Sequence, residues 1–398
     1  MESRKKILVF VTRFPVLTET FIERELSKLV DRNAVDLVVV ALRKGDGSVS
    51  ENLKDKVFYK RQGLLDVPGF LVYFFRNFST VPSLFRELEG GFIKKTFILL
   101  KSIGYAKYFS AFHPDLILAH FMSEQSTIAL IASKVTGIPF AISAHARDVT
   151  VSAENVSQKV KCAKFVTVCN KNAFDYLVKL VGVNSGNIYL SSHGIDFNKT
   201  NPKAVGGVEK PDKTLILSVG RLIEKKGLKY LIEASKTLKD RGLEHLVYII
   251  GPGLLYGELL EEIKNLGLED TVKILGEGKG LSQAETLKYF KTADIFAFPS
   301  IQTEEGDVDG VANVLLEAAA FRLPIVATDA GSTGELIINR ETGIVVAQKD
   351  SKGLADALES IIKDKSLGER LGLAVYNKVL ENFDLDKNIL KLEGLLTR

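Results

Sequence analysis

The acidic side chains of the stretch GDVDGVANVLLEAAA, residues 306–320, raise a question of chemistry. Asp309 lies in a glycine-flanked turn, and seven residues separate it from Glu317 in the apolar half of the stretch. A carboxylate among leucines and alanines is costly unless it is paired or binds a ligand. Accepting hydrogen bonds from two neighbouring hydroxyls, as a ribose presents, is one solution, and an ion pair with a nearby lysine is the other. Gly310 precedes the predicted helix, whose N-terminal amides and dipole can hold a phosphate or a polar sugar.

A second set of reactive side chains lies in LSVGRLIEKKGLKYLIEA, residues 217–234. An apolar strand is predicted to end at Gly220, and Gly227 is predicted to open the next helix. Arg221 and Lys226 stand in the turn between them, at the carboxyl edge of a predicted parallel sheet, where such folds bind ligands. A planar guanidinium and a compact ammonium can converge on one anion such as a diphosphate. The alternative is a basic surface turn with no ligand.

The chain has five histidines, and two of them follow predicted strands. His145 and Asp148 come at the end of the strand of residues 139–145. An imidazole there either acts on a ligand or caps the next helix, and both interpretations stay open. His193 and Gly194 lie in a tight turn, and His193 is interpreted as structural rather than catalytic.

The segment IIGPGLLYGE, residues 249–258, partly resembles a dinucleotide-binding fingerprint. Its spacing is GxGxxxG, whereas the fingerprint has GxGxxG. An acid, Glu277, follows the next predicted strand. A single glycine-rich turn is weak support, so NAD binding is a minor alternative here.

Composition sets limits on the class of protein. A chain of 398 residues favours two domains, and 46% apolar residues can bury large cores. The net charge of +4 does not point to nucleic acid. Two cysteines, Cys162 and Cys169, indicate neither a disulfide framework nor a zinc-ligand set, and they fit a reducing cytoplasm. The N-terminal apolar run stops before Thr12, which is too short for a signal peptide or a membrane span.

The elements that must position these side chains are short apolar runs alternating with helical patterns. Strands that are apolar from end to end are typical of parallel sheets covered on both faces, and their alternation with helices predicts doubly wound α/β domains. The segment 193–213, rich in Gly, Pro, Asn and Lys, is predicted to be a linker. The predicted strands are residues 6–12, 35–42, 115–121, 139–145 and 164–170 before the linker, and 214–220, 246–251, 272–276, 295–300, 324–329 and 343–347 after it.

Residues 58–112 interrupt this alternation. Fourteen aromatic residues lie there, and eight Lys or Arg stand against three acids. One interpretation is a set of amphipathic helices that touch an anionic membrane surface or a lipid-bearing substrate. The other is a set of helices that pack on the first sheet and expose their lysines to water. No part of the segment is long and uncharged enough to span a bilayer.

Taken together, these motifs resemble the retaining nucleotide-sugar glycosyltransferases of the GT-B fold, in the large family four group. The branch that builds bacterial exopolysaccharides of the colanic-acid type is the most similar. The resemblance covers nearly the whole chain, and the order and spacing of the motifs carry it. The motifs are RFPVLTETFIERE (13–25), SVGRLIEKKG (218–227), DGVANVLLEAAA (309–320), ATDAGSTGELI (327–337) and ETGIVV (341–346).

The resemblance implies an architecture and an activity. Two Rossmann-like parallel-sheet domains would face a central cleft: an acceptor-side domain, 1–200, and a nucleotide-sugar domain, 201–375, with the helical segment 376–398 returning to the first domain. The enzyme would move a sugar from a UDP- or GDP-sugar to a glycan or lipid-linked acceptor, with no metal and no other cofactor. It would work in the cytoplasm or peripherally at the inner face of the membrane, through 58–112.

The resemblance also implies roles for particular residues. Arg221 and Lys226 would neutralise the diphosphate of the donor and its leaving charge, and Glu317 would hold the ribose hydroxyls. Asp309 would stand beside the donor sugar at the first position of the acidic pair, and His145 would lie at that sugar. The implied catalytic set is His145, Asp309, Arg221 and Lys226; the implied donor-binding set is Gly220, Arg221, Lys226, Gly310, Val311, Ala312, Asn313, Glu317 and Glu335.

The sequence also departs from the family pattern. Asp309 is one methylene shorter than the usual glutamate, and Ala312 replaces a proline. Ser332 and Gly334 replace a glycine and a proline in a nearby loop. Two other functions therefore stay open: a GT-B epimerase of nucleotide sugars, and a catalytically degenerate module that only binds them.

Overall fold

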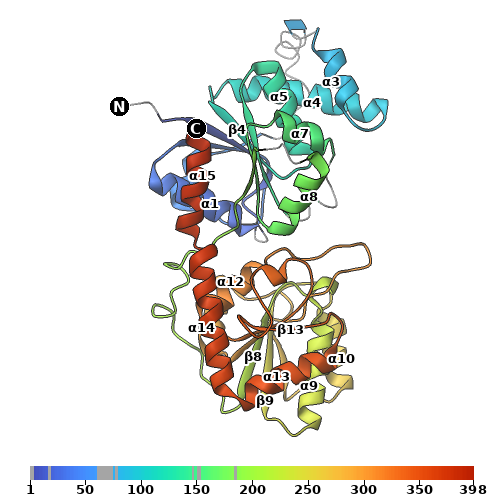
Figure 1. Cartoon of the computed structure of the whole chain (residues 1–398), viewed down its shortest axis with the longest axis vertical. Helices are drawn as coiled ribbons and strands as arrows, with labels where there is room; N and C mark the ends of the chain where they lie inside the picture. The colour runs from blue at the N-terminus through green and yellow to red at the C-terminus, as the bar shows by residue number, and fades with distance from the viewer. Residues whose placement is uncertain are drawn as a thin grey trace. The chain divides into compact units, whose positions relative to one another are not determined.

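The computed structural model describes residues 4–16, 19–60, 75–76, 79–145, 148–149, 154–182 and 186–398. The chain forms two compact units. Unit 1 is Met1–His193 with Asp386–Arg398, and unit 2 is Gly194–Leu385. Each unit is an α/β domain around one parallel sheet, as the sequence predicts (Figure 1).

The unit boundaries differ from the predicted ones at 200/201 and 375/376. The segment after His193 joins unit 2 because its backbone bonds there: the Ile195 amide donates to Phe383 at 2.8 Å, and the Leu385 amide donates to Ile195 at 3.1 Å. Part of the predicted linker 193–213 is thus held to unit 2 by backbone hydrogen bonds. Val379 is buried in the unit 2 core, so the helix that contains it stays in unit 2 and only the last helix belongs to unit 1.

Unit 1 contains a seven-stranded sheet in the order β3-β2-β1-β4-β5-β6-β7, with every pair parallel. Five of its strands follow the predicted runs, and two short ones, β3 and β7, extend the edges. The strands are β1 (Lys6–Phe14), β2 (Asp36–Lys44), β3 (Val57–Tyr59), β4 (Leu116–His120), β5 (Phe140–Ala144), β6 (Val166–Val168) and β7 (Ile188–Leu190).

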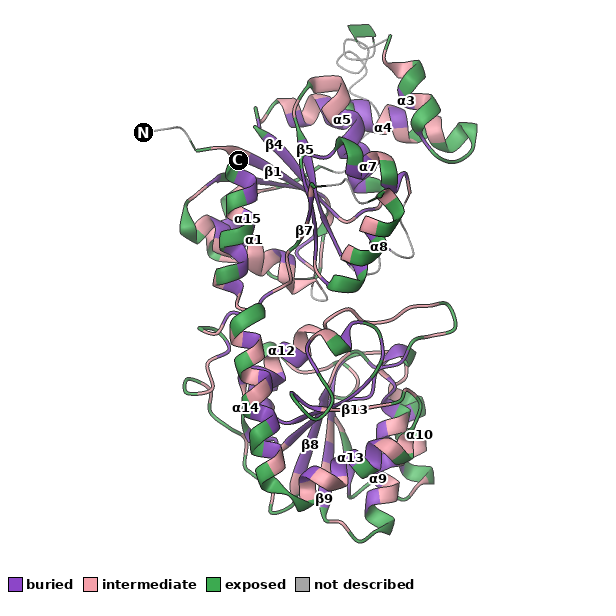
Figure 2. Ribbon diagram, viewed as in Figure 1, coloured by how far each residue is buried: buried purple, intermediate pink, exposed green. Residues whose placement is uncertain are grey.

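Helices cover both faces of the unit 1 sheet. One face packs against α4, α5, α7 and α8, and this core is buried throughout (Figure 2). α1 and α15 lie side by side (Figure 1), joined by ion pairs of Lys28 with Asp386 and Arg32 with Glu393. The described helices are α1 (Thr20–Arg32), η1 (Glu51–Lys56), α3 (Val81–Glu87), α4 (Phe92–Ser110), α5 (Glu124–Thr136), α7 (Val156–Cys162), α8 (Lys171–Val181) and α15 (Leu385–Thr397).

Unit 2 contains a six-stranded sheet in the order β10-β9-β8-β11-β12-β13, again with every pair parallel. Each of the six strands overlaps a predicted run. They are β8 (Thr214–Val219), β9 (His245–Ile250), β10 (Val272–Leu275), β11 (Ile295–Phe298), β12 (Ile325–Thr328) and β13 (Ile344–Val346).

Alternate side chains of the unit 2 strands enter two separate cores. Ile216 and Val247 belong to the core with α9, α10 and α13, whereas Leu215 and Phe296 belong to the core with α11, α12 and α14. This period of two is what a sheet covered on both faces requires. The helices are η2 (Glu224–Lys226), α9 (Leu228–Asp240), α10 (Tyr256–Asn265), α11 (Gln283–Thr292), α12 (Asn313–Ala320), η3 (Thr333–Glu335), α13 (Ser351–Lys363) and α14 (Lys365–Asn382).

The segment 58–112 divides into two parts with different surroundings. The second half of α4 is buried in the unit 1 core through Tyr105, Ala106 and Phe109. The first turn of α4 is exposed to solvent: Phe92 is 74% exposed and Ile93 is 85% exposed. Residues 61–74 and 77–78 lie outside the described part of the chain. None of the described helices combines the length and the low charge that crossing a membrane needs.

Candidate active site

The basic turn of unit 2 is built on glycine. β8 ends at Val219, and the chain turns through η2 into α9, whose N-cap is Gly227. Gly227 has a φ of 59°, and a Cβ added to it would lie 2.0 Å from the carbonyl oxygen of Pro299. Only glycine fits such a left-handed and crowded position. The turn is therefore fixed against the end of β11, which holds its lysines in place.

Lys226 and Asp309, both predicted site residues, meet in an ion pair. The Lys226 Nζ lies 2.7 Å from Asp309 Oδ2. Lys225, which the motif does not single out, lies 3.3 Å from the other oxygen of Asp309 and 3.2 Å from Asp307. The Lys226 ammonium also lies 4.9 Å from the centre of the Phe298 ring. Two cations and two acids thus form one network at the end of the sheet.

The charge of Asp309 is stabilised by its partners. Burial raises the pKa of this carboxyl, but Lys226 and Lys225 outweigh that effect, and the pKa lies below its usual value. The hydroxyl of Ser300 donates to Asp309 at 3.1 Å. The Asp309 carbonyl accepts a bond from the Ser332 amide at 3.2 Å. Asp309 is held from both its side chain and its backbone, and it keeps Lys226 in a defined position.

The glycines of residues 249–258 have a packing role. A Cβ on Gly251 would lie 1.8 Å from the Gly220 carbonyl oxygen. The Leu222 amide donates to Pro252 at 2.7 Å. These glycines let the chain lie directly against the loop that carries Arg221. Close packing of two loops explains the GxG pattern without a dinucleotide.

The remaining predicted donor residues surround α12 and η3. The helix begins at Asn313, two residues later than the sequence pattern suggests, so Gly310, Val311 and Ala312 form the turn before it. Glu317 is half-buried on α12, and Glu335 is half-buried at the end of η3. Arg221 is exposed. Of the predicted site residues, Lys226 and Asp309 are brought together in the ion pair described above.

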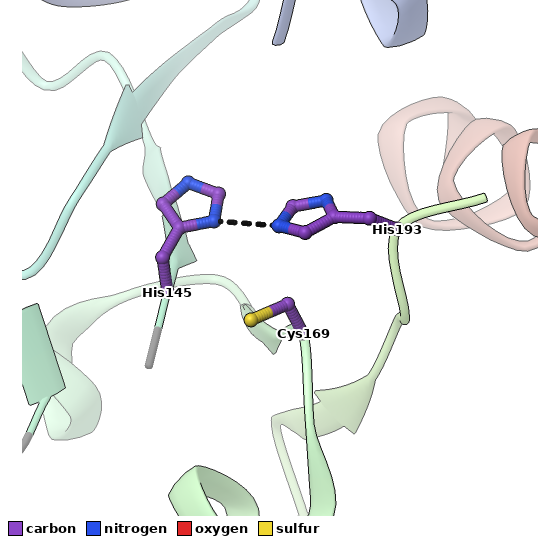
Figure 3. Close-up of side chains that lie close together, drawn as sticks. All are labelled: His145, Cys169 and His193. Atoms are coloured by element: carbon purple, nitrogen blue, oxygen red, sulfur yellow. Dashed lines mark hydrogen bonds between the residues drawn. The ribbon is translucent and has the colours of Figure 1, made fainter. Parts of the chain in front are cut away.

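His145, the predicted site residue of unit 1, stands in a row of imidazoles. Its Nδ1 lies 3.1 Å from His193 Nε2, and its Nε2 lies 3.5 Å from His120 Nδ1 (Figure 3 shows the first pair). The Phe21 ring packs on His193 with 4.0 Å between ring centres and on His145 with 4.8 Å. The His145 side chain therefore faces other rings. Residues 146–147, where a capped helix would begin, lie outside the described part.

Burial keeps these imidazoles neutral. It lowers the pKa of His120 and of His193 to about 3, and it lowers that of His145 well below the usual value. The neighbouring imidazoles add to the effect at His145. Near neutral pH, His145 is accordingly a neutral hydrogen-bonding group rather than a cation.

The backbone of His145 is positioned by Asp148. One oxygen of Asp148 accepts the His145 amide at 2.8 Å, and the other accepts the amide of Met122. Lys159 donates to the carbonyls of Met122 and Ser123 at 2.6 and 2.8 Å. Burial raises the pKa of Asp148 to about 7 and lowers that of Lys159 to about 7. This buried polar network holds the ends of β4 and β5 together.

Two parallel-sheet α/β units of this topology define the GT-B class of glycosyltransferases. A glycosyltransferase from Rickettsia africae has the same fold, with a TM-score of 0.74 at 16% identity over 99% of this chain and 98% of that one. The Anabaena protein HepE in complex with UDP-glucose superposes with a TM-score of 0.65 at 18% identity over 98% of this chain and 99% of that one.

The sequence of unit 2 matches the model of a known family. Residues 202–378 match the model of the family described as glycosyl transferases group 1. A Salmonella typhimurium protein with the provisional name colanic acid biosynthesis glycosyltransferase WcaL is 27% identical over 385 residues, covering 90% of this chain and 93% of that one. The chain is a glycosyltransferase with a group 1 domain, as its motifs imply.

Sequence reasoning missed three residues of these two edges, Lys225, His120 and Cys169, and it missed the contact made by His193. Lys225 adjoins a predicted residue, and only its burial beside Asp309 distinguishes it. His120, Cys169 and His193 share a signal in the sequence, because each lies at or just after the carboxyl end of a strand. β4 ends at His120, and a donor side chain follows β5, β6 and β7 at His145, Cys169 and His193. Neighbouring parallel strands bring such positions to one edge.

Proposed function

We propose that this glycosyltransferase moves a sugar, with retention of configuration, from a UDP- or GDP-sugar to a glycan or lipid-linked acceptor in exopolysaccharide biosynthesis. The ion-paired Lys226 at the carboxyl edge of the unit 2 sheet is the observation that carries the proposal. The name of the Salmonella relative supports the pathway class, and the UDP-glucose bound by HepE supports the donor class.

The chemistry depends on stabilising the leaving diphosphate. Lys226 and Arg221 follow β8 within seven residues, and Gly227 fixes the turn between strand and helix. Cationic groups held in place before the reaction can stabilise charge that develops on the phosphate, as an oxyanion hole does. In the proposal these side chains supply the positive charge, with no bound metal. The half-buried Glu317 accepts bonds from the ribose, and the neutral His145 contacts the transferred sugar.

The test removes both cations. In Arg221→Ala with Lys226→Ala, nucleotide release from the accepted donor is expected to fall by at least about 10³-fold, since one such contact is worth roughly 10²–10³-fold. A thermal-shift panel of UDP- and GDP-sugars identifies that donor first, because a bound ligand stabilises the folded state. The matched control is Lys229→Ala with Lys236→Ala, which removes two exposed charges from α9. Turnover that survives the first pair nearly unchanged would contradict the site assignment.

The two other functions give different outcomes in the same assay. An epimerase would convert the sugar without releasing nucleotide, and chromatography of the donor would show the new epimer. A degenerate module would bind the donor and produce neither product. Release of nucleotide together with a glycosylated acceptor supports the transferase.

We also propose that the first turns of α4 contact an anionic membrane, where a lipid-linked acceptor would reside at the cytoplasmic face. Phe92, Ile93 and Phe97 are exposed there, and Lys95 lies beside the Phe85 ring. Exposed apolar side chains next to lysines suit an anionic interface. The double change Ile93→Ser with Phe97→Ser is expected to reduce flotation with anionic vesicles. Leu254→Ser, at a 94% exposed position of unit 2, is the control. Equal flotation of all three proteins would exclude this surface.

A further inference from the structure

Unit 1 contains a group of three potential metal ligands that the proposed sugar transfer does not account for. His145, Cys169 and His193 each offer a ligand atom, and these atoms lie within 4.8 Å of one another. Figure 3 shows the thiol beside the two imidazoles. His145 and His120 are buried, and Cys169 and His193 are half-buried. Transfer of a sugar requires at most one of these residues, so the grouping calls for another explanation.

The distances suit a zinc ion. In a tetrahedral zinc site, two nitrogen ligands about 2.05 Å from the metal stand roughly 3.3 Å apart, and a nitrogen and a sulfur ligand stand roughly 3.6 Å apart. The Nδ1 of His145 and the Nε2 of His193 are 3.1 Å apart. The sulfur of Cys169 is within 4.8 Å of them, so a small rotation of a side chain would complete the set.

The ring nitrogens also suit a metal. A histidine binds a metal through the lone pair of a neutral ring. The Nδ1 of His145 and the Nε2 of His193 face each other, so the lone pairs of two neutral rings can converge on one ion. Metal binding would place the remaining hydrogen of His145 on Nε2 and that of His193 on Nδ1. Only the Cys169 thiol must then release a proton.

His120 completes the arrangement behind the metal ligands. A ligating histidine normally donates its other ring N–H to an acceptor, which fixes its tautomer. The Nδ1 of His120 lies 3.5 Å from His145 Nε2, in place to accept that hydrogen. Within the described part of the chain, the Nε2 of His120 is a buried polar atom without a hydrogen-bond partner. A metal on His145 would fix the His120 tautomer and give its buried ring a defined role.

We propose that unit 1 binds one Zn²⁺ through His145, Cys169 and His193, with His120 as the acceptor behind His145. Two imidazoles and a thiolate are ligands that zinc prefers, and three protein ligands leave a fourth position for water. The Phe21 and Phe121 rings pack on His145 and supply an apolar wall. A second consequence rests on the proposed function: zinc on His145 removes that imidazole from the donor sugar, so zinc inhibits transfer.

Cobalt titration of the metal-free protein tests the site, with reductant present. Co²⁺ is expected to bind at one equivalent and to give the charge-transfer absorption of a cobalt–thiolate bond, which Zn²⁺ then abolishes by displacement. Cys169→Ser is expected to lose this absorption. Cys162→Ser, which changes the exposed cysteine, is the matched control and should keep it. Far-UV circular dichroism establishes that each variant is folded.

Two further variants keep the test decisive if Cys169→Ser does not fold. His193→Asn should weaken cobalt binding at least tenfold, because it removes a ligand. His120→Phe should weaken it by about 10- to 100-fold, as the loss of such a supporting contact does elsewhere. Wild-type protein that takes up no cobalt, or that gives no thiolate absorption when it does, would overturn the site. So would equal absorption in wild type and Cys169→Ser.

Activity separates the second consequence from the first. Zn²⁺ at one equivalent should slow nucleotide release by the wild type and leave Cys169→Ser unaffected. Cobalt binding without inhibition by zinc would support the metal site and overturn the assignment of His145 to the sugar. A metal-free wild type that releases no nucleotide would overturn the proposed function and leave the cobalt result standing.

Discussion

The carboxyl edges of the two sheets have the same architecture and opposite chemistry. In unit 2 the edge carries charges that are paired: Lys225 and Lys226 with Asp307 and Asp309. In unit 1 the edge carries neutral rings, His120, His145 and His193, under aromatic side chains. Both sheets are parallel throughout, so topology alone does not decide what kind of site an edge becomes.

The difference shows how the neighbours of a buried group select its chemistry. A buried carboxyl beside two ammonium groups keeps its charge, as Asp309 does. An imidazole enclosed by rings loses its proton because the charged form is poorly solvated. The first kind of edge suits a diphosphate, and the second suits a hydrogen bond, a proton transfer or a soft cation.

The largest expected effect concerns the rigidity of the unit 2 edge. Gly227→Ala forces a side chain into a left-handed conformation and against the Pro299 carbonyl, where a Cβ would lie at 2.0 Å. Strain and overpacking together should destabilise unit 2 by about 2–5 kcal/mol. Hydrogen exchange read by peptide distinguishes the units: protection should fall in α9 and β11 and stay unchanged in β4 and β5.

Gly257→Ala is the matched control for that experiment. Gly257 lies in α10, and a Cβ there would meet nothing within 4 Å. An exposed helical glycine replaced by alanine should stabilise by about 0.5–1 kcal/mol. If both variants behaved alike, the fixed turn would not be what holds Lys226 in place.

The next effect concerns Asp309. In Asp309→Asn, both lysines lose a buried counter-charge, and the proposed contact with the donor sugar loses its carboxylate. Transfer is expected to fall by roughly 10²-fold, the size of one electrostatic contact at a reacting centre. Nucleotide binding, measured by calorimetry, should change little because Arg221, Lys226 and Glu317 remain. Unchanged transfer would leave Asp309 with a structural role only.

Much of this fold can be predicted from the sequence, because apolar runs and their alternation with helices carry the information. The runs at 214–220 and 295–300 became β8 and β11, and their order along the chain implied parallel sheets. The pairing of Lys226 with Asp309 could not be predicted, since 82 residues separate them and only the fold brings them together. The short edge strands β3 and β7 are too brief to show a pattern.

The grouping of side chains at the carboxyl edge of the unit 1 sheet was even harder to predict from the sequence. From two cysteines the sequence analysis predicted no zinc-ligand set, because the familiar zinc patterns have ligands that are close along the chain. His145, Cys169 and His193 are instead distributed one to each of three strand ends. Reading the first three residues after every strand, rather than local spacing, would have brought them together.

The smallest expected effect tests whether the unit 1 edge is neutral. Because the pKa values of His120 and His193 are about 3 and that of His145 is also depressed, their ring resonances should not shift between pH 5 and 8 in histidine-labelled, metal-free protein. The unfolded chain binds protons to these rings near pH 6.5, so their contribution to stability is present above that pH and is lost as the pH falls toward 3.

Other groups of unit 1 titrate in the same pH range and also change the free energy of unfolding. The histidine ring resonances, rather than the pH dependence of stability, therefore test whether the imidazoles are neutral. The pKa of Asp148 is raised to about 7, so its contribution to stability is lost as the pH rises through 7. The pKa of Lys159 is lowered to about 7, so its contribution to stability is lost as the pH falls through 7. The protein unfolded in urea is the control, in which the same resonances should titrate near 6.5. If His145 titrated near 6.5 in the folded protein, it would be a cation at the acidic end of this range. The carboxyl edges of both sheets would then carry charged side chains, which would contradict the comparison.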